Sequence, residues 1–313
     1  MGDRKIKVGF MGTPDFACPT LEKLYNDKDI ELCFVVTKED KPAGRGKEIK
    51  ESDVKQCIKK LCESKNTCFA IQDKYTPHIF TPHKIKEDRE VIDAMKKCDV
   101  DFIVVVAYGQ ILSKEILDIP KYACINGHAS ILPKYRGSSP TQGSILAGDK
   151  ETGTTAMLMS EGLDEGDILN IKKIDIKDDD TGESLFEKLS YLTADVVVET
   201  IKNYKDMTPI KQDNEKATYV KMIKKEDGLI DPKNETFSEI DRKVRAYYPW
   251  PGAYIIEKGK RIKIFKIKYA KNLENMQKNL IYQVKDGYME VLELQQEGKK
   301  RMSARDYLNG VKA

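Results

Sequence analysis

The feature that most constrains the fold is an uninterrupted apolar run, Phe-Ile-Val-Val-Val-Ala, within residues 101–107. A strand with apolar side chains on both faces is typical of the centre of a parallel β-sheet that helices cover on both sides. Further strand patterns occur at residues 6–12, 31–37, 67–71 and 123–126, with helical patterns between them. This alternation predicts an α/β fold with a Rossmann-like, mostly parallel sheet and helices on both faces.

The helical patterns predict where the elements of this first domain begin and end. We expect helices at residues 14–25, 52–63, 84–97, 113–117 and 141–146, and a further strand at residues 154–159. A long amphipathic helix over residues 181–205 is expected to close the domain. The sequence therefore predicts a first domain over residues 1–206, followed by a linker that begins at Met207.

Residues 207–313 have a different pattern of apolar and charged residues, which predicts a second, smaller domain. Residues 261–268 alternate basic and apolar side chains, with one slip of phase at Ile264-Phe265 that predicts a bulge or bend. Residues 279–294 read as two strands around an Asp286-Gly287 turn. We expect a C-terminal β-barrel, similar to an OB-fold, in this domain.

Several classes of protein are disfavoured by what the sequence lacks. No apolar run approaches the roughly 18 residues that span a bilayer, and no signal-peptide pattern opens the chain, so we expect a cytoplasmic protein without a membrane partner. The seven cysteines contain no Cys-x-x-Cys pair, which favours reduced core thiols over zinc or disulfides. The first turn lacks the third glycine of a dinucleotide-binding motif, and no phosphate-binding loop of the Walker type occurs, so we expect neither NAD nor ATP.

Only three histidines occur, and one of them lies in a position suited to chemistry. His78 and His83 belong to a Pro-flanked segment that we expect to be a surface loop. His128 stands at the carboxyl end of a predicted strand, where open α/β sheets bind ligands. Asn126 lies two residues before it, so both side chains share one face and could hold an oxyanion.

Two loops follow this strand, and the residues alone leave their roles open. Residues 130–140 form a Gly/Pro/Ser-rich loop, and residues 159–167 form an acidic loop that contains Asp164. Asp164 is either an ordinary turn residue or a carboxylate that orients His128. Spacing does not decide between these readings, because the contact would be tertiary.

A family resemblance favours a catalytic role for these residues. The Asn-x-His of residues 126–128, the Ser-hydrophobic-Leu-Pro of residues 130–133 and the downstream Asp164 together resemble the folate-dependent formyltransferases. Gly127 between Asn and His, and Ile131 in the second place of the loop, depart from the family pattern without removing a functional side chain. Residues 10–17, 41–47 and 298–304 are similar to the branch that acts on initiator methionyl-tRNA, so the resemblance covers about residues 6–310.

The resemblance implies a reaction and a set of catalytic residues. The formyl group of 10-formyltetrahydrofolate would pass to the amino group of initiator methionyl-tRNA by direct attack, without a metal. Asn126 and His128 would stabilise the oxyanion, and Asp164 would steady the charged His128. The expected folate contacts are backbone groups, with Leu132 as an apolar wall, among Tyr108, Gly109, Gln110, Ser130, Ile131, Leu132 and Pro133.

Basic residues in two places are the expected tRNA contacts. A glycine-containing loop carries Lys41, Arg45 and Lys47, although such loops are often simply solvated. Residues 208–313 carry a balance of +8, to which Arg261 and Lys263 contribute on one strand face. Lys266 and Lys268 join that face only if the phase slip is a bulge.

Other functions share part of this pattern. A formyltransferase acting on a sugar nucleotide or another small amine would also need Asn126, His128 and Asp164. A non-catalytic RNA-binding protein and a hydrolase that releases formate are the remaining alternatives. The segments 41–47 and 298–304 favour the tRNA substrate, and we expect the protein to be a monomer.

Overall fold

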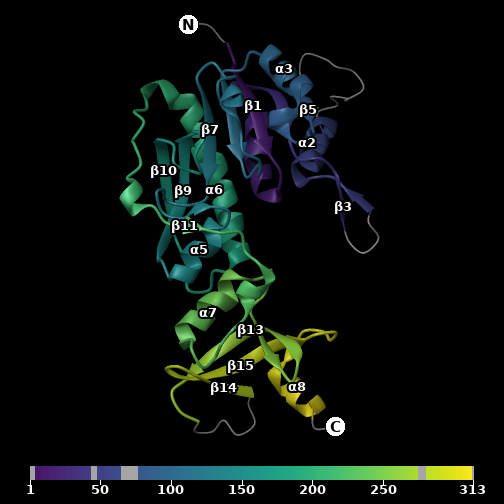
Figure 1. Cartoon of the computed structure of the whole chain (residues 1–313), viewed down its shortest axis with the longest axis vertical. Coiled ribbons are helices and arrows are strands. Elements are labelled where there is room, and N and C mark those ends of the chain that lie inside the picture. The colour runs from purple at the N-terminus through teal and green to yellow at the C-terminus, as the bar shows by residue number, and fades with distance from the viewer. Residues whose placement is uncertain (1–3, 44–47, 65–76, 274–279, 312–313) are drawn as a thin grey trace. The chain divides into compact units, whose positions relative to one another are not determined.

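The computed structural model describes residues 4–43, 48–64, 77–273 and 280–311, and its chain forms two compact units (Figure 1). Unit 1 contains Met1–Arg136, Gly153–Ile174 and Glu187–Tyr219, and unit 2 contains Gly137–Thr152, Asp175–Phe186 and Val220–Ala313. Two short segments that precede residue 206 therefore belong to unit 2. The domain boundary expected after residue 206 stays a prediction.

Unit 1 is built on a seven-stranded sheet in the order β10-β9-β7-β6-β1-β2-β5. Neighbouring strands from β7 to β5 run parallel, and β9 runs antiparallel to β7. The Rossmann-like, mostly parallel sheet is thereby confirmed. The strands are β1 (Ile6–Gly12), β2 (Ile30–Val36), β5 (His78–Phe80), β6 (Phe102–Val106), β7 (Ala123–His128), β9 (Glu151–Leu158) and β10 (Ile168–Asp175).

Helices cover both faces of this sheet because its central strand is apolar on both sides. All five residues of β6 are buried. On one face, Ile103 and Val105 pack in a cluster with Ile92 of α3 (Arg89–Lys97) and Ile116 of α4 (Lys114–Leu117). On the other face, α6 (Gly182–Asn203) approaches β7. The two buried faces predicted for residues 101–107 are therefore confirmed.

The predicted helices are present, with two breaks. Residues 14–25 form a 3₁₀ helix η1 (Asp15–Ala17) followed by α1 (Cys18–Asn26), with Pro19 in the first turn of α1. Residues 84–97 form η2 (Ile85–Glu87) and then α3, because Asp88 caps α3 by accepting a hydrogen bond from Val91 N at 3.2 Å. The remaining helices of the N-terminal half are α2 (Asp53–Ser64), α5 (Pro140–Ala147) and η3 (Tyr204–Asp206).

Several short strands were missed by the sequence analysis. His78 lies in the edge strand β5 rather than in a loop, although it is exposed as expected. Strand β10 has isoleucines at positions 168, 171 and 174, a spacing that imitates a helix. The strand expected at residues 67–71 lies outside the described residues. The other short strands are β3 (Lys41–Ala43), β4 (Glu48–Lys50), β8 (Arg136–Gly137) and β11 (Tyr219–Val220).

Unit 2 contains an antiparallel, barrel-like sheet in the order β12-β13-β15-β14, with β16 paired to β15. Its strands are β12 (Tyr254–Glu257), β13 (Lys260–Ala270), β14 (Leu280–Val284), β15 (Gly287–Gln296) and β16 (Met302–Ser303), and its helices include η5 (Lys225–Gly228), α7 (Phe237–Ala246) and α8 (Ala304–Val311). The pairing of β13 shifts register between Ile264 and Ile267, so the predicted bulge is confirmed. Ile240, Ile262 and Leu294 lie in its core.

The cysteines carry no cross-link among the described residues. Cys18, Cys33, Cys57, Cys62, Cys98 and Cys124 are all free. Burial raises the pKa of Cys33 and of Cys124 to about 12, which keeps both as neutral thiols. Within the same residues, no helix has the length and apolar character to cross a bilayer, and no three His, Cys, Asp or Glu side chains gather as a metal site.

Candidate active site

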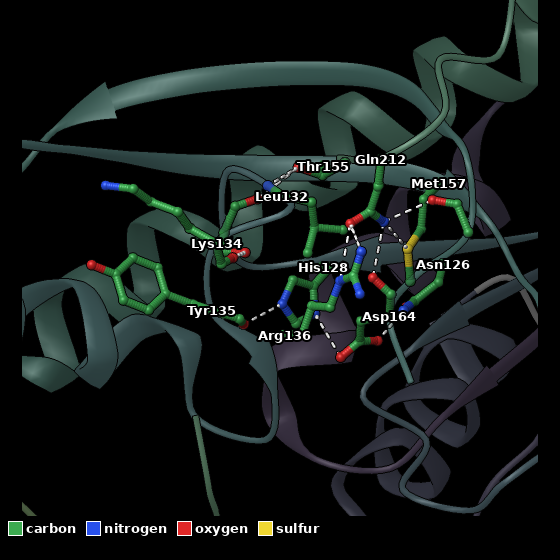
Figure 2. Close-up of polar contacts among 12 residues, drawn as sticks. Asn126, His128, Leu132, Lys134, Tyr135, Arg136, Thr155, Met157, Asp164 and Gln212 are labelled. Atoms are coloured by element: carbon green, nitrogen blue, oxygen red, sulfur yellow. Dashed lines mark hydrogen bonds and ion pairs between the residues drawn. The ribbon is translucent and has the colours of Figure 1, made fainter. Parts of the chain in front are cut away.

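The carboxyl end of β7 carries Asn126 and His128 on one face of the sheet (Figure 2). Asn126 pairs with Val105 of β6 and with Met157 of β9, so it lies in the middle of the sheet. The strand extends two residues beyond the predicted end and includes His128. Gly127 faces the opposite side, where a Cβ atom would lie 2.6 Å from Cγ2 of Thr193 in α6. Glycine between the two polar residues thus lets α6 pack directly on β7.

His128 is held at both ring nitrogens. Its side chain is nearly buried, and Nε2 lies 2.9 Å from the carbonyl oxygen of Tyr135. A carbonyl oxygen only accepts, so Nε2 carries a hydrogen. Nδ1 lies 3.7 Å from Oδ2 of Asp164. With Nε2 as the donor to Tyr135, Nδ1 is the ring nitrogen that faces the carboxylate of Asp164.

Asp164 is presented by a tight turn between β9 and β10. Its φ of 51° lies in the left-handed region, which is uncommon for a residue with a side chain. Nδ2 of Asn126 donates to Oδ1 of Asp164 over 3.4 Å, so the carboxylate faces both polar residues of β7. The structure therefore brings Asn126, His128 and Asp164 together.

Gln212 and Arg136, which the sequence analysis did not identify as site residues, stabilise the turn that carries Asp164. Nε2 of Gln212 donates to the carbonyl oxygens of Asp164 at 2.9 Å and of Gly166 at 2.7 Å. The Oε1 atom of the same amide accepts two hydrogen bonds from Arg136, whose side chain is only 1 % exposed. No spacing pattern links Gln212 to the motif residues, because the contacts are tertiary.

The loop at residues 130–133 is tied to β9. Oγ1 of Thr155 donates to the carbonyl oxygen of Ser130 at 2.7 Å and accepts from the amide of Leu132 at 3.1 Å. Leu132 is 3 % exposed and packs with Met157 and Ile168, so its side chain is part of the core rather than an open wall. Ile131 and Pro133 are half-buried and offer the accessible surface of this loop.

Residues 107–110 leave β6 at the same edge of the sheet, because β6 and β7 are parallel neighbours. Gly109 has a φ of 76° and is exposed. The Tyr108 side chain is buried, and its carbonyl oxygen accepts from Oγ1 of Thr13 at 2.8 Å. The Gln110 amide accepts from Ile85 N and donates to the carbonyl oxygen of His83. The accessible groups of this segment are therefore backbone atoms near Gly109.

The expected tRNA contacts are distributed over both units. Lys41 is exposed on β3 in unit 1, whereas Arg45 and Lys47 lie outside the described residues. In unit 2, Lys263 is half-buried on β13, and the guanidinium of Arg261 stacks 4.0 Å from the ring centre of Tyr254. Lys266, at the bulge, and Lys268, beyond it, are exposed.

Both parts of the chain match known sequence families. The N-terminal part, residues 4–201, matches the formyl transferase family, and residues 222–312 match the formyl transferase C-terminal domain. A methionyl-tRNA formyltransferase of Caldicellulosiruptor saccharolyticus is 43 % identical over 98 % of this chain and 97 % of its own. That of Sulfurimonas denitrificans is 42 % identical over 97 % of each chain.

Solved structures share the fold at lower identity. A methionyl-tRNA formyltransferase from Clostridium thermocellum superposes with a TM-score of 0.55 at 21 % identity, covering 85 % of this chain and 94 % of its own. An N-formyltransferase from Helicobacter canadensis, bound to folinic acid and dTDP-3-aminofucose, gives a TM-score of 0.61 at 17 % identity, covering 95 % and 100 %. From the matches over both of its parts, the chain belongs to the formyl transferase family.

Proposed function

We propose that the protein transfers the formyl group of 10-formyltetrahydrofolate to the amino group of initiator methionyl-tRNA. The observation that carries the proposal is the meeting of Asn126, His128 and Asp164 at the carboxyl end of β7. The substrate follows from the relatives named methionyl-tRNA formyltransferase, which are about 40 % identical over nearly their whole length. The solved sugar formyltransferases are below 20 % identical and share the fold.

The reaction exchanges one acylated nitrogen for another. The amine nitrogen of methionyl-tRNA attacks the formyl carbon, and the electron pair of the carbonyl bond moves to oxygen. When the oxyanion collapses, the bond to the folate nitrogen breaks, and the formyl group remains on the amine. The proton that the amine loses is balanced by the proton that the folate nitrogen gains.

Asn126 and His128 stabilise the oxyanion of this intermediate. One amide N–H of Asn126 points toward Asp164, which leaves the second to donate to a substrate oxygen. The Nδ1 side of His128 faces the same space, and its charged form would attract the oxyanion directly. Removing one donor of this kind typically lowers the rate on the order of a hundredfold.

The folate is proposed to lie against the two backbone segments at this edge of the sheet. Exposed backbone near Gly109 and the half-buried Ile131 and Pro133 are the groups that can contact it. Tyr108, Gln110, Ser130 and Leu132 instead shape these segments through their buried contacts. The tRNA is proposed to meet Lys41, Arg45 and Lys47, and the basic face of β13 with Arg261 and Lys263.

One assay tests this function against its alternatives. The protein is incubated with 10-formyltetrahydrofolate and charged initiator tRNA, and formylmethionine is measured after hydrolysis of the ester. A parallel reaction supplies an amino-sugar nucleotide, and a third supplies neither acceptor. Formyl transfer to the sugar alone, release of formate alone, or tRNA binding without turnover would each contradict the proposal.

A further inference from the structure

Arg136 is a charged residue in the interior of unit 1, which is rare without strong partners. Its guanidinium donates four hydrogen bonds, two to Oε1 of Gln212, one to Oδ1 of Asn214 and one to the hydroxyl of Tyr219. All of these acceptors are uncharged oxygen atoms. These bonds use four of the five N–H donors of Arg136. They also fix the orientation of the Gln212 amide.

The orientation of this amide determines what it offers to the catalytic turn. Because Oε1 accepts from Arg136, Nε2 must point the other way, toward the carbonyl oxygens of Asp164 and Gly166 (Figure 2). Both bonds are shorter than 3.0 Å and one ends on Asp164 itself. Gln212 thus holds the backbone of the residue whose carboxylate faces His128.

The same segment also holds the opposite side of His128. Thr218 accepts from the amide of Tyr135 through Oγ1 at 2.8 Å and from the amide of Arg136 through its carbonyl oxygen at 2.8 Å. The carbonyl of Tyr135 is the acceptor for Nε2 of His128. Residues 212–219, which we call the strap, therefore contact the supports of both ring nitrogens.

We propose that the strap, through Gln212 and Thr218 as positioning residues, holds the Asp164 turn and the Tyr135 carbonyl at the distances that His128 needs for formyl transfer. The strap lies between residues 201 and 222, outside both family matches. This inference rests on the proposed function and assigns a role in the same reaction to a segment that sequence would describe as a linker. Gln212 does not touch the substrate; it acts through Asp164.

Gln212→Glu separates positioning from folding. A glutamate keeps an oxygen for Arg136 and adds an ion pair, whereas the N–H donor to Asp164 and Gly166 is replaced by a second oxygen that repels their carbonyls. We expect kcat to fall by roughly tenfold to a hundredfold, as for a small misplacement of a catalytic group, with little change in KM for the folate. The variant should stay folded, because the new ion pair with Arg136 offsets part of the stability lost with the two donated hydrogen bonds.

Two further variants keep the test independent of folding. Gln56→Glu makes the same chemical change in α2, at an amide that donates to the carbonyl oxygen of Glu51, so its kcat should equal that of the wild type. Thr218→Val keeps a side chain of similar shape but removes the hydroxyl that accepts from the Tyr135 amide. We expect kcat to fall less than in Gln212→Glu. If Gln212→Glu does not fold, the kcat of Thr218→Val alone tests the positioning role of the strap.

A double-mutant cycle with Asp164→Asn gives the decisive readout. If Gln212 acts through the carboxylate of Asp164, the second substitution should lower kcat by less than threefold once the carboxylate is absent. Effects that multiply fully, or a loss of kcat that follows the loss of stability, would overturn the positioning role. Transfer by the wild type is measured in the same experiment, so an inactive wild type would refute the proposed function, and with it this inference.

Discussion

Nδ1 of His128 lies 3.7 Å from Oδ2 of Asp164, and both side chains are largely buried, with exposures of 8 % and 13 %. Water screens such a pair poorly, so any charge on the ring interacts directly with the carboxylate. The distance exceeds that of a hydrogen bond and leaves Nδ1 available to a substrate oxygen. The pair therefore fits the proposed role of stabilising an oxyanion at the formyl carbon.

Replacing Asp164 by asparagine should reveal this electrostatic role. The amide keeps the shape of the side chain but removes the negative charge that faces Nδ1 of His128. We expect kcat to fall on the order of a hundredfold, with KM for the folate within about threefold of wild type. Steady-state formylation of methionyl-tRNA measures both constants, and a kcat equal to that of the wild type would exclude the role.

Replacing His128 by alanine should abolish transfer and leave folate binding in place. The imidazole is proposed to contact the reacting oxygen, whereas the folate is proposed to rest on backbone groups of other segments. Single-turnover transfer and equilibrium binding of 10-formyltetrahydrofolate are measured on the same preparation. His83→Gln is the matched control, because His83 is exposed and pairs with Glu39. Loss of folate binding together with transfer would contradict the separation of roles.

The sheet could be predicted because its signal is local. The apolar residues of β6 require burial on both faces, and that requirement alone implies parallel neighbours and covering helices. The short strands β5 and β8 were missed because two or three residues carry no period. The break before α3 depends on one capping bond of Asp88, which the helical pattern around it conceals.

The arrangement of the candidate active site could be predicted only in part. Asn126 and His128 are two residues apart on one strand, so their shared face follows from geometry. The approach of Asp164 depends on a turn far along the chain, and only the family resemblance pointed to it. Arg136 and Gln212 were missed because their contacts join a loop to a segment that reads as a linker, and no local pattern encodes such a contact.

Gly127→Ala should damage both stability and catalysis. The new Cβ atom would lie 2.6 Å from Cγ2 of Thr193 and 2.9 Å from Cγ2 of Val197, so β7 and α6 must separate. Overpacking of this kind costs about 1–3 kcal/mol in free energy of unfolding. Denaturant unfolding measures the loss, with Gly310→Ala as control, since nothing lies within 4 Å of a Cβ atom there. An unchanged free energy of unfolding would mean that α6 can shift away from β7 without a loss of stability.

Arg136→Met should destabilise unit 1 more than an exposed arginine substitution does. The change leaves the buried Oε1 of Gln212 without its two donors, and an unsatisfied buried acceptor costs about 1–3 kcal/mol, whereas the exposed Asn214 can bond to water instead. Arg89→Met provides the comparison, because Arg89 is 60 % exposed in its pair with Glu115 and should change stability little. Equal unfolding midpoints for the two variants would show that the interior network contributes nothing to stability.

Lys263→Ala should weaken the use of tRNA without affecting the folate. Each phosphate contact that a lysine makes releases counterions, so its loss raises KM for tRNA and makes the dependence of log KM on log salt shallower by about 0.7–0.9. Steady-state formylation at several salt concentrations measures this slope, and KM for the folate is measured alongside. Lys150→Ala, at a lysine whose side chain is 84 % exposed, controls for the loss of charge in general. An unchanged slope in Lys263→Ala would place the tRNA elsewhere than on β13.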